Sequence, residues 1–353
     1  MSQIFNPLIT PVSVANGGTG DSTLTAHGVL LGEGTSNVVA TAAGNIGQVL
    51  TGQGSSADPI WSNAAFPNDF RLTLTSGTPV TSSDVTAATT LYLASLTGNR
   101  FTTFDTNGNP TILNSNQISI AIPATTNTVY DVWAYNNSGT LTLELLAWSS
   151  DTARATSLTT ANGRYVKSGD NTRMYVGTIR TTGVSGQTED SALKRYIWNY
   201  YNRRPRKLSR QETAASSTMA DGVGINFRQM NNSTSNQVEV VLGVDEELVS
   251  LWMNCPTTAD TATNTNLSAN QIGIGLDSTT TATLTQTIVN ITPGSNSAQT
   301  TQLGGSFGGV IDTAIGHHLL QMLEKAGNGN GTTSFFYGGT YAGAALLTGY
   351  ING

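Results

Sequence analysis

The feature that most constrains this chain is a strand-like alternation of apolar and polar residues, broken by turns. Residues 70–75 and 117–123 place an apolar side chain at every second position. Turns rich in Gly, Asn and Pro separate such segments at intervals of about 8–15 residues, a spacing typical of sandwiches and barrels. No stretch of about ten residues between positions 66 and 160 has helical spacing. The sequence therefore predicts an all-β fold.

The strand-like segments divide into two groups. Residues 129–135 and 141–148 flank Asn136-Asn137-Ser138-Gly139, a strong hairpin signal, and fall within a first predicted β-sandwich over 66–186. Residues 211–353 contain about seven or eight further segments, a number that suits a second, jelly-roll-like sandwich. The Thr-rich stretch 277–302 is predicted to be a long surface excursion within it.

Composition excludes several classes of protein. The chain has 353 residues, enough for about two domains and a tail. Only 11% are charged and the net charge is −6, which argues against a nucleic-acid binder as a whole. The single cysteine, Cys255, excludes an internal disulfide and is expected to be buried. We expect no signal peptide, and no apolar run approaches the roughly 18 residues of a membrane span.

A basic, aromatic stretch lies between the two predicted sandwiches. Eleven of the 16 Lys and Arg residues fall within 164–210, and four aromatics fall within 196–201. We define residues 187–210 as the joint. Residues 188–202 fit a short helix with Thr188 as N-cap, but their aromatics also favour strands, and the sequence leaves both open.

Three interpretations of the joint remain open. It could contact nucleic acid, form a solvated or interdomain cluster with Glu189, Asp190 and Glu212 as counter-charges, or dock against an acidic protein partner or a neighbouring protomer. Its candidate interdomain or intersubunit residues are Lys194, Arg195, Trp198, Tyr201, Arg203, Arg204 and Arg206.

Residues 1–65 carry no Lys or Arg and contain a repeat with a period of 20 residues. The segment 29–36 (VLLGEGTS) returns as 49–56 (VLTGQGSS), each a short apolar strand with a Gly-rich turn. Two such units cannot bury a core alone, so the segment is either flexible or pairs with copies of itself or with another protein. The apolar residues that favour pairing are Val29, Leu30, Val49, Leu50 and Trp61.

Catalytic and metal-binding patterns are absent from the sequence. His317 and His318 are adjacent, so on a strand they point to opposite faces and cannot serve one site. The densest acidic cluster, Asp245-Glu246-Glu247, is predicted to be a solvated turn. We therefore predict a non-enzyme with no catalytic, cofactor-binding or metal-binding residues and no cofactor.

Several motifs carry a family resemblance. NGGTG, GVLLGEGTS and GQVLTGQGSSADPIW resemble the N-terminal repeats of bacteriophage tail fibres and other virion appendage proteins. FRLTLTSG, YDVWAYNNSGTLTLELLAW, VKSGDNTRMYVGTIRTTG and QTEDSALKRYIWNYYNRRPR resemble, in order, a module of the same proteins, and QIGIGLDSTT resembles their C-terminal part.

The resemblance implies a structural protein of a tailed bacteriophage, located in the virion. It implies a homotrimeric tail fibre attached to other virion proteins through 1–65 and directed toward a host polysaccharide or protein. One alternative is a capsid decoration or head-fibre protein, which differs in its location on the particle. An alternative of another functional class is a tailspike-like glycan hydrolase. Neither nucleic-acid binding nor membrane insertion is expected. Candidate receptor or interface aromatics, which could equally fill cores, are Trp252, Phe335, Phe336, Tyr337, Tyr341 and Tyr350.

Overall fold

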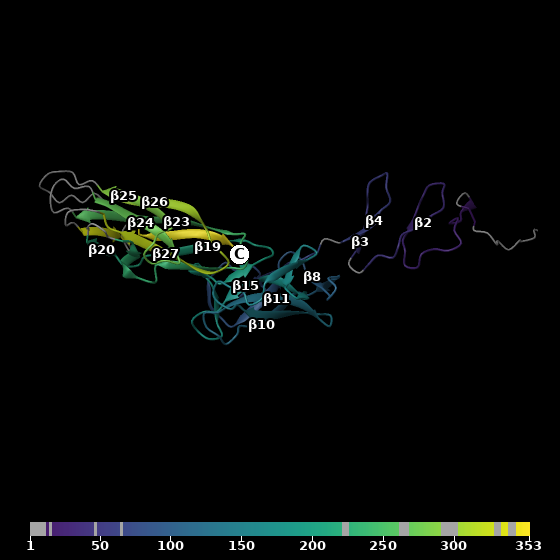
Figure 1. The fold of residues 1–353 in the computed structure, drawn as a ribbon, viewed down its shortest axis with the longest axis horizontal. Helices are drawn as coiled ribbons and strands as arrows, with labels where there is room; N and C mark the ends of the chain where they lie inside the picture. The colour runs from purple at the N-terminus through teal and green to yellow at the C-terminus, as the bar shows by residue number, and fades with distance from the viewer. Residues whose placement is uncertain are drawn as a thin grey trace, which may run out of the picture.

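The computed structural model describes residues 12–13, 16–45, 48–63, 66–220, 226–260, 268–290, 303–327, 333–337 and 344–353. Within these ranges the chain forms β-strands, turns and a single-turn 3-10 helix at Met230–Asn232, and no α-helix, so the all-β prediction is confirmed. Figure 1 shows N-terminal hairpins, a first β-domain and a longer second β-domain, in that order. The described ranges hold no helix long and apolar enough to cross a membrane.

The N-terminal part forms two separate antiparallel hairpins. The first pairs β1 (Leu30–Leu31) with β2 (Val39–Ala40), and the second pairs β3 (Gln48–Thr51) with β4 (Ile60–Asn63). Neither hairpin joins a larger sheet among the described strands. Two-stranded hairpins are only marginally stable in water.

The first domain packs a three-stranded sheet and a hairpin against a six-stranded sheet. The small sheet has the order β10-β7-β5, and the six-stranded sheet has the order β12-β11-β15-β14-β13, with β18 also paired to β15. Their bounds are β5 (Phe70–Thr73), β7 (Thr90–Ser95), β10 (Gln117–Ala121), β11 (Val129–Asn137), β12 (Thr140–Ala147), β13 (Leu158–Ala161), β14 (Arg164–Lys167), β15 (Asp170–Arg180) and β18 (Ile197–Asn199); the hairpin is β8 (Arg100–Phe104) with β9 (Pro110–Asn114).

The predicted hairpin at Asn136–Gly139 is confirmed. Asn137 pairs with Thr140, which leaves Ser138 and Gly139 as the two turn residues. Both have positive φ, 51° and 90°, as the twist of a two-residue hairpin turn requires. Glycine adopts this backbone conformation without steric cost.

The second domain is a sandwich of two large sheets. One has the order β25-β24-β27-β22-β17-β16-β6, with β21 paired to β27, and the other has the order β19-β29-β23-β28-β20, with β26 paired to β23. Their bounds are β6 (Val85–Ala88), β16 (Thr188–Asp190), β17 (Lys194–Arg195), β19 (Pro205–Gln211), β20 (Ser216–Ala220), β21 (Arg228–Gln229), β22 (Gln237–Leu242), β23 (Leu248–Asp260), β24 (Ser268–Leu276), β25 (Leu284–Asn290), β26 (Leu303–Asp312), β27 (Gly316–Lys325), β28 (Thr333–Tyr337) and β29 (Leu346–Asn352).

The joint consists of strands that belong to both domains. β18 extends the six-stranded sheet of the first domain, whereas β16, β17 and β19 belong to the two sheets of the second. The helical alternative for residues 188–202 is therefore wrong, and the strand alternative is confirmed. β6, which lies within the first predicted sandwich, pairs with β16, so one sheet runs across the boundary.

One further expectation needs correction. The predicted surface excursion at 277–302 contains β25, which pairs along seven residues with β24. The rest of that stretch is a turn at 277–283 and residues outside the described ranges. Leu284, Gln286 and Ile288 are the less exposed positions of β25, but Gln286 is polar and Thr suits both strands and loops, so the sequence does not display the alternation.

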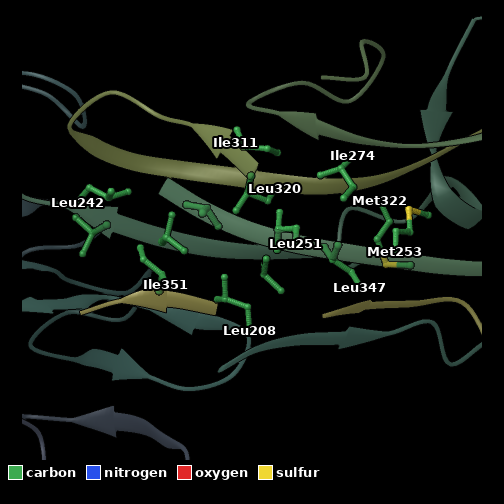
Figure 2. Close-up of a cluster of buried hydrophobic side chains, with 14 of the residues drawn as sticks. Leu208, Leu242, Leu251, Met253, Ile274, Ile311, Leu320, Met322, Leu347 and Ile351 are labelled. Atoms are coloured by element: carbon green, nitrogen blue, oxygen red, sulfur yellow. The ribbon is translucent and has the colours of Figure 1, made fainter. Parts of the chain in front are cut away.

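The core of the second domain lies between its two sheets (Figure 2). Leu242, Ile274 and Leu320 project from one sheet and meet Leu251 and Ile351 from the other; all five are at most 1% exposed. Cys255 is also buried, as predicted, and belongs to this core.

Candidate functional site: a charged joint and two exposed apolar surfaces

Asp190 is the central carboxylate of the joint. Its Oδ1 accepts a hydrogen bond from Arg195 Nη1 and its Oδ2 accepts one from Arg206 Nη2, each at 2.8 Å. Arg206 also donates to the carbonyl of Thr81, at 2.9 Å. All four residues are buried, and they come from β16, β17, β19 and the loop before β6. One carboxylate thus joins the two sheets of the second domain, and Arg206 extends the network to the loop before β6.

A second buried pair joins Arg154 to Asp131 on β11. Arg154 Nε lies 2.8 Å from Asp131 Oδ2, and Thr178 donates to Asp131 Oδ1 at 3.0 Å. Arg154 also donates to the carbonyl of Gly243 in the second domain and lies over the ring of Trp148. Burial raises the pKa of Asp131, and the charge of Arg154 opposes that rise. The arginine therefore both neutralises a buried carboxylate and links the domains.

A third group surrounds His317 on β27. His317 Nε2 lies 3.0 Å from Glu239 Oε2, and its Nδ1 lies 3.4 Å from Asp151 Oδ2. Tyr196 donates its hydroxyl proton to Glu239, and Arg180 Nη2 lies 3.1 Å from Asp151 Oδ2. His318 faces the opposite side, where its Nδ1 lies 2.8 Å from Asp277, as the prediction of opposite faces requires.

The pKa of Glu239 makes part of the stability pH-dependent. Burial disfavours its charge, but hydrogen bonds from His317 and Tyr196 and the charge of Lys194 outweigh burial and lower the pKa from 4.5 to about 2. A depressed carboxylate pKa stabilises the fold above the unfolded value and loses that effect as pH falls toward the folded value. We expect Glu239→Gln to remove an acid-dependent loss of up to about 3 kcal/mol between about pH 4.5 and 2.

Urea unfolding of parent and variant across this pH range would measure the difference. Asp245→Asn is the control, because Asp245 is exposed and has no ion pair among the described residues. Equal pH slopes for the parent and Glu239→Gln would contradict the assignment.

Arg203 accounts for the acidic cluster 245–247. Its guanidinium pairs with Glu246 at 2.9 Å and with Glu247, and its Cζ lies 4.8 Å from the ring centroid of Trp198. The carboxylates of Glu246 and Glu247 are thus held by the joint, while Asp245 is exposed.

The other candidate joint residues differ in exposure. Arg195, Arg206 and Trp198 are buried, Lys194 and Tyr201 are half-buried, and Arg204 is exposed. Lys194 Nζ lies 3.9 Å from Glu189 and 4.0 Å from Glu239. Of the proposed counter-charges, Asp190 and Glu189 pair with cations, whereas Glu212 accepts a hydrogen bond from Asn236 instead.

Several residues that the structure places in these networks could not be identified from the sequence. Arg71 is buried, and burial together with the charge of Arg206 lowers its pKa to about 10. Its Nη1 donates to the carbonyl of Asn202, 131 positions away. Asp131, Arg154 and Glu239 likewise meet partners from other segments of the chain, which residue spacing does not reveal.

The candidate receptor aromatics separate into two groups. Trp252 and Tyr350 are 45% and 42% exposed, and their ring centroids lie 5.9 Å apart. Phe336 is 2% exposed and belongs to the core, so it is not available for receptor contact. Phe335 and Tyr337 lie on β28, but their side chains, like the whole of Tyr341, lie outside the described part of the structure.

The candidate attachment residues lie on the two hairpins. Val29, Leu30, Val49 and Leu50 are between 36% and 48% exposed. Trp61 is half-buried, and its Nε1 donates to the carbonyl of Ala42 at 2.8 Å, which joins the second hairpin to the chain between the two. Four apolar side chains are thus left uncovered within one chain.

Comparisons with known proteins leave the chain without an assigned family. No family description and no curated protein matches it. The structure of infectious bursal disease virus, Gx strain, is 12% identical, with 82% of this chain and 83% of that chain covered and a TM-score of 0.21. The VP2 subviral particle of that virus is also 12% identical, with 72% of each chain covered and a TM-score of 0.21.

A Bacillus thuringiensis Cry1Da tryptic core variant is 10% identical, with a TM-score of 0.16, and covers 75% of this chain and 48% of its own. Likenesses at these scores do not define a relationship. What the fold and the joint define is a class: an all-β protein of two sandwich domains locked by buried ion pairs, preceded by open hairpins. The groups of Asp, Glu, His and Cys in the described ranges include none able to hold a metal ion.

Proposed function

We propose that this chain is a non-enzymatic structural protein of a tailed bacteriophage virion, and that it forms a homotrimeric tail fibre. In this proposal, residues 1–65 attach to other virion proteins and the second domain points toward the host surface. The observation that carries it is the uncovered apolar side chains of the two N-terminal hairpins. A hairpin gains little stability alone and is stabilised when its apolar side chains are buried by neighbouring chains.

Two further features support a fibre subunit. The joint places strands in the sheets of both domains, and His317–Asp151 and Arg154–Gly243 contacts link the domains further, which suits a protein that must transmit position along its length. The motifs that resemble phage appendage proteins also occur in the expected order. A capsid decoration or head-fibre protein would share this chemistry and differ only in its location on the particle.

We expect light scattering of the full chain to give a mass of about three chains of 36.9 kDa at several protein concentrations. Replacing Val29, Leu30, Val49 and Leu50 together by serine should shift the protein toward monomer, because these side chains lose the apolar surface that copies would bury. All four side chains are exposed, and substitutions at exposed positions change the stability of a single chain little.

The control replaces Val80, Ile112 and Val184 by serine, since these are 38%, 37% and 56% exposed but lie outside the two N-terminal hairpins. A monomer at every concentration of the parent would contradict the autonomous trimer and favour a decoration subunit. If the hairpin variant remains a trimer, the contact between copies lies elsewhere in the chain. Incorporation of a chain lacking residues 1–65 into particles would contradict the proposed polarity.

A tailspike-like hydrolase would require two carboxylates facing a cleft at about 5–9.5 Å. Release of reducing sugar from host polysaccharide, abolished by a single carboxylate substitution, would replace the structural proposal with this one. Binding without release would favour a non-enzymatic appendage.

A further inference from the structure

Trp252 and Tyr350 form an aromatic pair on the outer face of the second domain. They lie on adjacent paired strands, β23 and β29. Their chain neighbours Leu251 and Ile351 are at most 1% exposed and point into the core (Figure 2), so the two rings point outward. The planes of the rings differ by 33°, so the rings are tilted toward each other and do not make an edge-to-face contact.

A glycine fixes how the tryptophan lies. Gly308 on β26 is paired with Trp252 across the strands. A Cβ added to Gly308 would overlap Trp252 Cδ1 and Nε1, so the indole occupies the space that any other side chain would fill. The ring consequently lies against the sheet, with its outer face available to a ligand.

Hydroxyl groups and one cation surround the rings. Thr348 is the cross-strand partner of Trp252, and Ser250 is that of Tyr350. On the next strand, Lys207 is paired with Tyr350, is exposed, and makes no ion pair among the described residues. Flat apolar rings thus alternate with short hydrogen-bonding groups.

We propose that this surface, defined by Trp252, Tyr350, Gly308, Ser250 and Thr348, binds a glycan by stacking a pyranose ring on the aromatic pair. The C–H bonds on one face of a pyranose carry partial positive charge, which the negative face of an aromatic ring attracts. The hydroxyl groups around the sugar ring would meet Ser250, Thr348 and Lys207. This inference rests on the proposed function, in which the second domain contacts the host surface.

A second copy of the chain fits this surface less well. Stable protein interfaces bury about 800 Å² per partner around a contiguous apolar centre. Val310 and Leu248, each 52% exposed, extend the apolar area on this face. Ser250 lies in the middle of it, between Val310 and Tyr350 across the strands and between Leu248 and Trp252 along β23, so a polar group interrupts the apolar area at its centre. A sugar, which has apolar faces and a polar rim, matches that alternation.

The test titrates full-length protein with cellohexaose, chitohexaose, maltohexaose and hexagalacturonate, each up to about 10 mM, and follows tryptophan fluorescence and ligand NMR saturation transfer. We expect at least one to bind with a Kd of about 1 mM or tighter. Trp252→Ala should weaken that binding by about tenfold or more, which corresponds to about 1.4 kcal/mol, while Trp252→Tyr should retain part of it.

Gly308→Ala tests the geometry without removing a ring. The added methyl group must displace the indole, so we expect weaker binding. Gly304→Ala on the same strand is the matched control, because its added Cβ would meet nothing within 4 Å and binding should not change.

Failure of all four oligosaccharides to bind, or binding that Trp252→Ala leaves unchanged, would overturn the inference. A lower solution mass for Trp252→Ala would assign the surface to contact between copies and would also overturn it. Because the parent's mass is measured separately, a trimer that binds no sugar contradicts this inference alone, and a monomer that binds sugar contradicts the proposed trimer alone.

Discussion

Replacing Asp190 by alanine is expected to lower the free energy of unfolding by about 3–5 kcal/mol, because the change leaves buried charges without their partner. Arg195 and Arg206 are 7% and 8% exposed, and each gives Asp190 a hydrogen bond of 2.8 Å. Their remaining acceptors, among them the carbonyls of Lys207 and Thr81, carry no net charge. Two adjacent guanidinium groups would then repel each other in a region of low dielectric.

Urea unfolding followed by tryptophan fluorescence measures this loss, since urea, unlike a guanidinium salt, does not screen charges. Glu246→Ala is the control, because its carboxylate also pairs with an arginine but its side chain is 46% exposed. Exposed pairs contribute about 0–1 kcal/mol. If Asp190→Ala costs no more than Glu246→Ala, the joint does not depend on this carboxylate.

The sequence predicted strands best where one face of the strand is solvated. In β12, Leu141 and Leu143 point into the first core, and the intervening Thr142 is half-buried, so apolar and polar residues alternate visibly. The turn at Ser138-Gly139 then fixes the pairing of β11 with β12. Local chemistry alone determines this hairpin, which is why it could be predicted.

The joint was ambiguous because its strands are buried on both faces. On β18, Ile197 packs in the core of the first domain while the adjacent Trp198 packs in the core that extends into the second. Such a strand shows no alternation, and its run of apolar residues can be fitted to a helix as easily as to a strand. Tertiary burial, which the sequence does not display, decides between them.

Some charged residues of the joint could be predicted from the sequence, but most of their partners could not. A cluster of arginines with few nearby acids implies that any buried member needs a carboxylate, and Asp190 was identified in this way. Its contact through Arg206 to Thr81, however, spans 125 positions, and Asp131 on β11 meets Arg154 from the connection between β12 and β13. Pairing across sheets depends on topology, so residue spacing could not predict these contacts.

Replacing Arg154 by alanine is also expected to lower the free energy of unfolding by about 3–5 kcal/mol. In this case a buried carboxylate, that of Asp131, loses the cation that pairs with it. Asp131 is 2% exposed, and burial already raises its pKa. Without Arg154, Asp131 should take up a proton at a higher pH, so the penalty should shrink as pH falls and the carboxyl becomes neutral. The carbonyl of Gly243 would lose its donor at the same time.

Arg100→Ala is the matched control, because Arg100 pairs with Asp69 at 3.5 Å but its side chain is 59% exposed. We expect that change to cost about 0–1 kcal/mol at any pH. Unfolding in urea at pH 7 and pH 5 distinguishes the two cases: the Arg154 variant should recover part of its lost stability at pH 5, and the Arg100 variant should not change. A pH-independent loss for Arg154→Ala would mean that packing against Trp148 and Tyr175, rather than the charge of Asp131, accounts for its contribution.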